Sequence, residues 1–184
     1  MRDRNLNLTK ALLGCVLCAL GFVFSGCQTA KEDVASYTNP LTARRTDVLG
    51  QNLLETKEPG REMIWLNAYR DFLNLYEYRY YLELIYGANE QVGYLDIGPG
   101  RSLTIVADGK EMNFTSLGSL EKEKEGAAVF ERVRYDATTD DLNRIANAKQ
   151  VGVRVVGQNG IVIRQFGPEN FDKFRKFMEQ ASGI

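Results

Sequence analysis

Beyond residue 61, hydrophobic and polar residues alternate along much of the chain, which is the pattern of strands with one buried face. The alternation is clearest from Tyr76 to Tyr86. One face of this predicted strand carries Tyr76, Tyr78, Tyr80, Leu82, Leu84 and Tyr86, and the other carries Glu77, Arg79, Tyr81, Glu83 and Ile85. Ala127–Asp136 is a further predicted strand. Met63–Phe72 alternates less regularly and is predicted as a strand, with a short helix as the alternative.

Two dipeptides predict hairpins. Asp108-Gly109 separates Ser102–Ala107 from Glu111–Thr115, and Asn159-Gly160 separates Val151–Gly157 from Ile161–Phe166. Asp-Gly and Asn-Gly between strand-like runs favour type I′ turns, because these residues tolerate positive φ.

Two helices are predicted late in the chain. Thr138 opens the first, with Asp141 three residues on in a capping-box arrangement, and Leu142, Ile145, Ala146 and Lys149 share one side. Pro168 lies in the first turn of the second. Its apolar stripe is Phe171, Phe174, Phe177, Met178 and Ala181, whereas Asp172, Lys173, Arg175, Lys176 and Glu179 face away.

Three segments lack a regular period. Gln28–Gly60 is polar, contains Pro40 and Pro59, and is predicted to be a flexible tether. Its Arg44-Arg45 pair is interpreted as solvated linker charge, with contact to phosphate head groups as the alternative. Gly87–Arg101 contains a turn region, and Leu117–Gly126, with the charged run Glu121–Glu125, is predicted to be an exposed loop or helical turn.

These elements predict one α+β domain over residues 61–184. We expect a mainly antiparallel sheet of about six or seven strands with two helices, the last of them C-terminal. A β-sandwich with two decorating helices is the alternative.

The first 27 residues have a different pattern. Arg2, Arg4 and Lys10 precede the apolar run Ala11–Phe24, which is 14 residues long. That is too short for a membrane span of about 20 residues and is typical of a signal-peptide core. An ordinary secretory signal cut elsewhere, or a short uncleaved membrane helix, is the alternative.

The stretch Phe24-Ser25-Gly26-Cys27 resembles the lipobox of bacterial lipoproteins, although Phe24 stands where they usually carry Leu, Val or Ile. The resemblance covers residues 1–28. It implies that residues 1–26 are a removed signal peptide and that the Cys27 thiol carries diacylglycerol, which anchors the protein to a cell-envelope membrane. Residues 27–60 are then the lipidated cysteine and tether, and Gln28 favours the outer membrane, facing the periplasm, in a Gram-negative host.

Composition narrows the chemistry. Cys15 and Cys18 leave with the signal and Cys27 carries lipid, so we expect no disulfide. The chain has no histidine. Removing residues 1–26 takes three basic residues and one acidic residue from 23 Lys/Arg and 24 Asp/Glu, which leaves a net charge of −3. This charge argues against nucleic acid as a partner and against electrostatic binding to anionic head groups.

Three groups of residues resemble functional sites, but none is predicted to be one. Asp136, Thr138, Asp140 and Asp141 are oxygen donors, but their spacing is that of helix capping and not of a calcium loop. Gly98-Pro99-Gly100-Arg101 lacks the ending of a phosphate loop and is predicted as a tight turn. Glu77 and Glu83 are about 20 Å apart along a strand, too far to act on one bond.

The remaining signal is a concentration of tyrosine. The cluster is Tyr69, Tyr76, Tyr78, Tyr80, Tyr81, Tyr86 and Tyr94, which we interpret as core and sheet surface, with a recognition face as the alternative. With no catalytic, metal-binding or cofactor-binding residue predicted, the sequence favours a non-catalytic lipoprotein domain that binds an envelope protein partner or has a structural role. A small-ligand-binding lipoprotein and an envelope hydrolase are the alternatives.

Overall fold

The computed structural model describes residues 34–56, 62–74 and 77–182. Phe24, Cys27 and Gln28 lie outside the described residues, so lipidation stays a prediction. Tyr76 also lies outside them. The described chain forms ten strands and two helices, and every strand pair is antiparallel.

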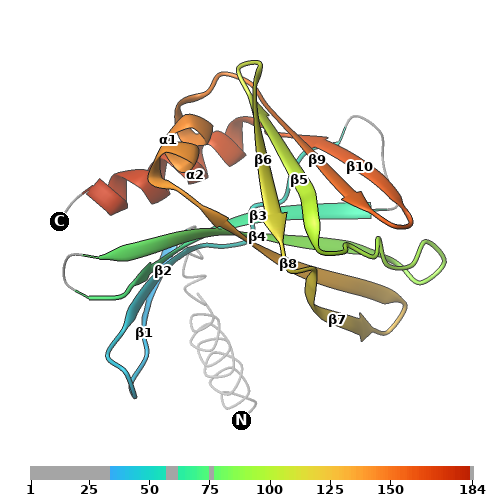
Figure 1. Ribbon diagram of the computed structural model, residues 1–184, viewed down its shortest axis with the longest axis horizontal. Coiled ribbons are helices and arrows are strands. Elements are labelled where there is room, and N and C mark those ends of the chain that lie inside the picture. The colour runs from blue at the N-terminus through green and yellow to red at the C-terminus, as the bar shows by residue number, and fades with distance from the viewer. Residues whose placement is uncertain (1–33, 57–61, 75–76, 183–184) are drawn as a thin grey trace, which may run out of the picture. The chain divides into compact units, whose positions relative to one another are not determined.

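The strands form two sheets (Figure 1). The six-stranded sheet has the order β1 (Val34–Thr38), β2 (Arg45–Leu49), β3 (Glu62–Phe72), β4 (Tyr78–Asn89), β8 (Ala128–Ala137), β7 (Ser119–Glu125). The four-stranded sheet has the order β10 (Gly160–Gln165), β9 (Val151–Gly157), β5 (Gly100–Ala107), β6 (Lys110–Ser116). The helices are α1 (Thr139–Asn147) and α2 (Pro168–Ser182).

A single core joins the sheets and helices. Alternate residues of β3, β4 and β8, such as Leu66, Leu84 and Val133, are fully buried together with Ile105 of β5. Both helices add side chains to the same cluster: Leu142 and Ile145 from α1, and Phe174, Phe177 and Met178 from α2. The α+β class with a C-terminal helix is therefore confirmed, but the ten described strands form two sheets and not the one sheet of about six or seven strands that we expected. The two sheets around one core also agree with the sandwich alternative.

The first predicted hairpin is confirmed. Ala107 pairs with Lys110 across a two-residue turn, and Asp108 and Gly109 have φ angles of 47° and 80°. Positive φ at both positions is what a type I′ turn requires.

The second hairpin exists, but its turn is one residue earlier than predicted. Gly157 pairs with Gly160, so Gln158 and Asn159 occupy the turn and neither has positive φ. The neighbouring loop fixes this register, because the backbone N–H groups of both turn residues donate to the carbonyls of Asp96 and Leu95. A Cβ at Gly157 would lie 2.1 Å from the Leu95 carbonyl oxygen, so this close approach requires glycine.

The segment Leu117–Gly126 contains strand β7 and is not the loop or helical turn that we expected. Its charges alternate with the period of a strand. Glu121 and Glu123 pair in register with Arg132 and Phe130 of β8 on one face. On the other face, Lys122 and Lys124 contact Asp96 and Glu90. A charged edge strand of this kind resists pairing with other chains.

The predicted flexible tether is wrong for residues 34–56, the part of Gln28–Gly60 that the structure describes, because these residues include strands β1 and β2. Strands β1 and β2 extend the sheet beyond β3, and α2 contacts both of them. The fully buried Arg70 donates through Nε (3.0 Å) and Nη2 to Asp47, which is also buried. Leu49, Asn52 and Leu54 are buried as well. The domain therefore includes residues that we had assigned to a linker.

Helix α1 begins as predicted. Thr138 accepts the backbone N–H of Asp141, and the Asp141 carboxylate accepts the N–H of Thr138 in return. Leu142, Ile145 and Ala146 are buried, whereas Lys149 lies beyond the end of the helix.

Helix α2 buries Phe174, Phe177 and Met178, as its apolar stripe predicted, while the side chain of Ala181 lies outside the described set. Lys173 corrects the prediction, because it is buried and not turned to solvent. Its Nζ lies 2.7 Å from Glu169 and donates to the Gln51 carbonyl at 3.3 Å. The lysine therefore joins α2 to the segment that follows β2.

Candidate functional site

The six-stranded sheet has one face in the core and a second face that points away from the four-stranded sheet. We call the second one the outer face. Because side chains alternate along each strand, its members are the intervening residues of β3, β4, β8 and β7. They include Met63, Trp65, Asn67, Tyr69, Tyr81, Glu83, Ile85, Phe130, Arg132, Arg134, Glu121, Glu123 and Glu125.

Glu83 organises the centre of the outer face. It is buried and lies opposite Asn67 in the register of β3 with β4. Its carboxylate accepts the Tyr69 hydroxyl at 2.8 Å and the Asn67 amide at 3.2 Å, and Arg132 lies 3.6 Å away. A buried carboxylate requires such partners, so Glu83 fixes the neighbouring side chains in place.

Two tyrosines stack beside this carboxylate. The rings of Tyr69 and Tyr81 are 4.6 Å apart with 10° between their planes, and the Arg134 guanidinium lies 4.1 Å from the Tyr81 ring centre. Burial raises the pKa of Tyr81 to about 12, and burial followed by the Glu83 charge raises the pKa of Tyr69 further. Both phenols are therefore neutral and can donate hydrogen bonds over the physiological pH range.

A shallow hollow of about 260 Å³ opens next to this cluster. Its apolar walls are Trp65, Ile85 and Phe130, and its polar lining is Gln51, Asn67, Glu123, Glu125 and Arg132. The Trp65 and Phe130 rings are 6.4 Å apart and converge over Gly87. A Cβ at Gly87 would lie 2.9 Å from Trp65 and 3.1 Å from Phe130, so glycine lets both rings rest on the strand.

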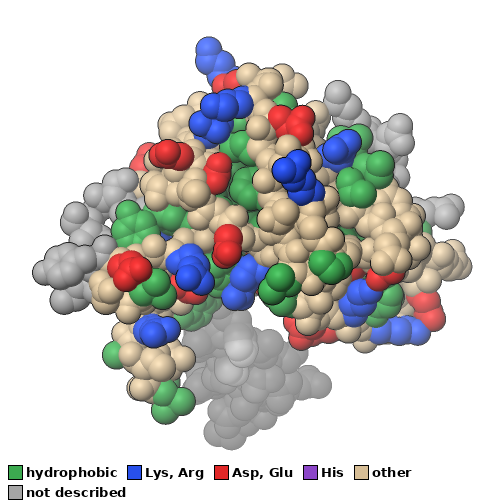
Figure 2. All heavy atoms as spheres, in the orientation of Figure 1, with side chains coloured by type: hydrophobic (Ala, Val, Ile, Leu, Met, Phe, Trp, Pro, Cys, Tyr) green, Lys and Arg blue, Asp and Glu red, His purple; other side chains and the backbone are tan. Residues whose placement is uncertain are grey.

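The hollow is bordered by acidic groups. Glu121, Glu123 and Glu125 lie along β7, and Arg132, which lines the hollow, is already placed 3.3 Å from Glu121 as well as beside Glu83. Elsewhere, acidic and basic side chains are interspersed over the side of the molecule drawn in Figure 2. The border of the hollow therefore favours a ligand with positive charge.

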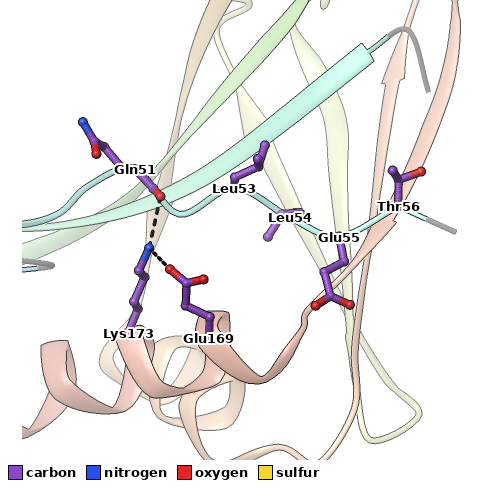
Figure 3. A pocket seen from close by; sticks show the side chains of 7 residues that line it. All are labelled: Gln51, Leu53, Leu54, Glu55, Thr56, Glu169 and Lys173. Atoms are coloured by element: carbon purple, nitrogen blue, oxygen red, sulfur yellow. Dashed lines mark hydrogen bonds and ion pairs between the residues drawn. The ribbon is translucent and has the colours of Figure 1, made fainter. Parts of the chain in front are cut away.

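A second hollow of about 520 Å³ lies between α2 and the segment 51–56 (Figure 3). Leu53 and Leu54 are its apolar residues, and Gln51, Glu55, Thr56, Glu169 and Lys173 complete it. Figure 3 shows Lys173 held between the Gln51 carbonyl and Glu169. Glu55 packs so closely on Gly167 that a Cβ there would overlap its carboxylate. This arrangement supports a structural connection between the segment and the helix.

The constellations weighed in the sequence have other roles. Thr138 and Asp141 cap α1, and within the described residues no group of three or more His, Cys, Asp or Glu is arranged to hold a metal ion. Gly100 has a φ of 105° where β5 begins, as a tight turn requires. Glu77 accepts from Asn74, whereas Glu83 contacts Tyr69, Asn67 and Arg132.

The sequence singled out Glu83, Tyr69 and Tyr81 and named Ile85 on the same face, but it did not identify the hollow or its aromatic walls Trp65 and Phe130. Trp65 and Phe130 both lie at outward positions of predicted strands. This alternation was the sequence signal that could have identified them as surface aromatic residues. Their convergence over Gly87 depends on the pairing of β3 with β4 and of β4 with β8, which alternation within one strand does not reveal.

Comparisons with models of known families, with curated proteins and with solved structures found no match for this chain. Among the residues that the structure describes, no helix has the length and apolar character needed to span a membrane.

Proposed function

We propose that this protein is a lipid-anchored envelope lipoprotein whose non-catalytic domain binds a protein partner through the outer face. The observation that carries the proposal is the pair Trp65 and Phe130, which converges beside a fixed network of polar side chains. Trp, Tyr and Arg are the residues that most often dominate binding energy at protein interfaces.

The outer face is already organised for binding. Tyr69, Tyr81 and Arg134 are held by stacking, and Asn67 and Arg132 are held by Glu83. Side chains that are ordered before association lose little conformational entropy when a partner binds. This favours a recognition role over an incidental cluster of strand residues.

The chemistry of the hollow defines the partner. Its three apolar walls fit one apolar or aromatic side chain, and the glutamates of β7 fit Lys or Arg on either side of it. We therefore propose a protein segment with an apolar anchor flanked by basic residues. The same acidic border disfavours contact of this face with anionic lipid.

A protein partner fits the dimensions better than an enclosed small molecule. Small-molecule sites are clefts of roughly 300–1,000 Å³ that enclose most of the ligand. The aromatic hollow, at about 260 Å³, is smaller than that range, and the larger hollow contains no aromatic wall.

The anchor has its own test. Metabolic labelling with a fatty-acid analogue should tag the wild-type protein, because the proposed lipid is attached to Cys27. The substitution Cys27→Ala should abolish the label. Label that persists in this variant would contradict the proposed anchor.

Photo-crosslinking in the native host tests the binding surface. A photoreactive phenylalanine analogue at Phe130 or Glu123 should give a discrete adduct with one protein, crosslinked at a segment rich in Lys or Arg. The same analogue at Ile161, exposed on the four-stranded sheet, is the matched control and should give none. Equal adducts at all three positions, or none at Phe130 and Glu123, would contradict the proposal.

A further inference from the structure

The hairpin of β1 and β2 ends in an exposed turn of unusual composition. Every residue from Tyr37 to Arg45 is exposed. Leu41 is 93% exposed and Tyr37 is 61% exposed, and both are large hydrophobic residues. Arg44 and Arg45 follow them, and Pro40 adds apolar surface. In Figure 2 the projecting end of this hairpin shows hydrophobic and basic side chains together.

Hydrogen bonds close this turn. Asn39 Oδ1 accepts the backbone N–H groups of Leu41 (2.9 Å) and Thr42 (3.2 Å), and the backbone of Asn39 bonds to that of Ala43 and Arg44. Arg45 Nε is engaged by Asp47 at 2.7 Å, whereas Arg44 is an exposed cation of the turn. The fold therefore presents Leu41 to solvent without a neighbour that covers it.

The turn is close enough along the chain to the proposed anchor at Cys27 to reach the membrane surface. Six residues separate Cys27 from Val34, the first residue of β1. Six residues reach at most about 20 Å when extended. The five paired positions of the hairpin span about 17 Å, so its turn can reach the plane of the lipid-bearing residue.

We infer that the turn Asn39–Arg44, together with Tyr37, is a membrane-contact element that seats the domain on the bilayer surface. The inference rests on the proposed lipid anchor at Cys27. Leucine and tyrosine partition into the interface between head groups and acyl chains, and arginine pairs with phosphate. The mature chain is acidic overall, but the local charge of the turn is positive, and attraction to head groups decays within a Debye length.

Fluorescence on lipidated full-length protein tests the inference. If Cys27 is lipidated, Leu41→Cys introduces the only thiol of the mature chain, which can be labelled with an environment-sensitive dye. In vesicles of phosphatidylethanolamine and phosphatidylglycerol, the dye at position 41 should emit at shorter wavelength and lose intensity when nitroxide-labelled lipids are added. Leu117→Cys, at a residue that is 94% exposed in another loop, is the matched control and should show neither change.

A charge variant adds a second readout. Arg44→Gln should lower the equilibrium constant for contact of the turn with the membrane about fivefold, since one arginine near an anionic surface contributes about that factor. Arg154→Gln, at an exposed arginine of β9, should have no effect.

The outcomes separate the turn from the anchor. Protein that sediments with vesicles but shows the same dye signal at positions 41 and 117 would overturn the inference and leave the anchor intact. Protein that does not sediment, with dye found on Cys27, would instead contradict lipidation.

Discussion

Strand β4 presents Tyr80, Leu82 and Leu84 to the core, whereas Tyr81, Glu83 and Ile85 point to the outer face. Both sets are largely buried, but they are held differently. The inner side chains pack against apolar groups of the other sheet and helices. The outer ones are held by hydrogen bonds, ring stacking and one central carboxylate.

This difference separates stability from recognition. Apolar burial and the buried pair of Asp47 and Arg70 stabilise the inner side, where truncation leaves cavities or unpaired charge. On the outer face, the buried and partly buried side chains hold polar and aromatic groups in fixed positions. Substitutions on the inner side should therefore reduce stability, and substitutions on the outer face should mainly reduce binding.

The largest effect is expected from removing β1 and β2. A fragment of residues 61–184 lacks Asp47, the ion-pair partner of Arg70, and exposes the edge of β3. It should show no cooperative unfolding transition, whereas residues 32–184 should show one in chemical denaturation. Cooperative unfolding of the shorter fragment would return residues 32–60 to the role of a linker.

Phe174→Ala should lower the free energy of unfolding by about 3–5 kcal/mol, because Phe174 is fully buried beside Phe166. Lys173→Ala, which removes the link to Gln51, should cost about 1–2 kcal/mol. Arg175→Ala, at an exposed position of the same helix, should stay within about 0.5 kcal/mol. Denaturant titrations measure the free energy of unfolding of all three variants. If Lys173→Ala and Arg175→Ala change it equally, Lys173 does not connect α2 to the segment that follows β2.

Low pH should lower the stability of the fold by protonating Asp47. Burial alone would raise the pKa of Asp47, but hydrogen bonds from Arg70, Ser36 and Arg45 outweigh it and hold the pKa below its ordinary value. A lowered folded-state pKa stabilises the protein above the unfolded value of about 3.9, and this contribution is lost as pH falls through the folded-state pKa. The stability difference between wild type and Asp47→Asn should therefore be constant from neutral pH down to about 5 and shrink at lower pH. A difference that is independent of pH would contradict this account of the pair.

Tyr69→Phe tests the outer network and should have a smaller effect. It removes the hydroxyl that donates to Glu83 and should cost about 1–2 kcal/mol in denaturation. Tyr37→Phe, at an exposed tyrosine of β1, is the control and should change stability by less than about 0.5 kcal/mol. If the two substitutions cost the same, Glu83 does not depend on Tyr69.

Local signals predicted the elements that depend on neighbouring residues. Asp108-Gly109 sets its own turn, and Thr138 caps its own helix with Asp141. Strand β2 could not be found in this way, because Asp47 becomes a core residue only through Arg70, which is 23 positions away. The register of the second hairpin likewise depends on Leu95 and Asp96.

The candidate site was only partly predictable for the same reason. Tyrosine enrichment pointed to β4, but the hollow combines β3, β4, β7, β8 and the residue Gln51. Strand β7 could have been predicted but was missed. Its alternating Glu and Lys have the period of a strand.

The most direct test of the account is the affinity of the purified crosslinked partner for Trp65→Ala, compared with Ile163→Ala on the four-stranded sheet. Trp65 lines the hollow, whereas Ile163 is 65% exposed on β10. Loss of an aromatic anchor typically costs 2 kcal/mol or more, which corresponds to at least about a 30-fold rise in Kd. We predict that rise for Trp65→Ala with cooperative unfolding retained, and no change for Ile163→Ala. An unchanged Kd for Trp65→Ala would contradict the claim that the outer face is the binding surface.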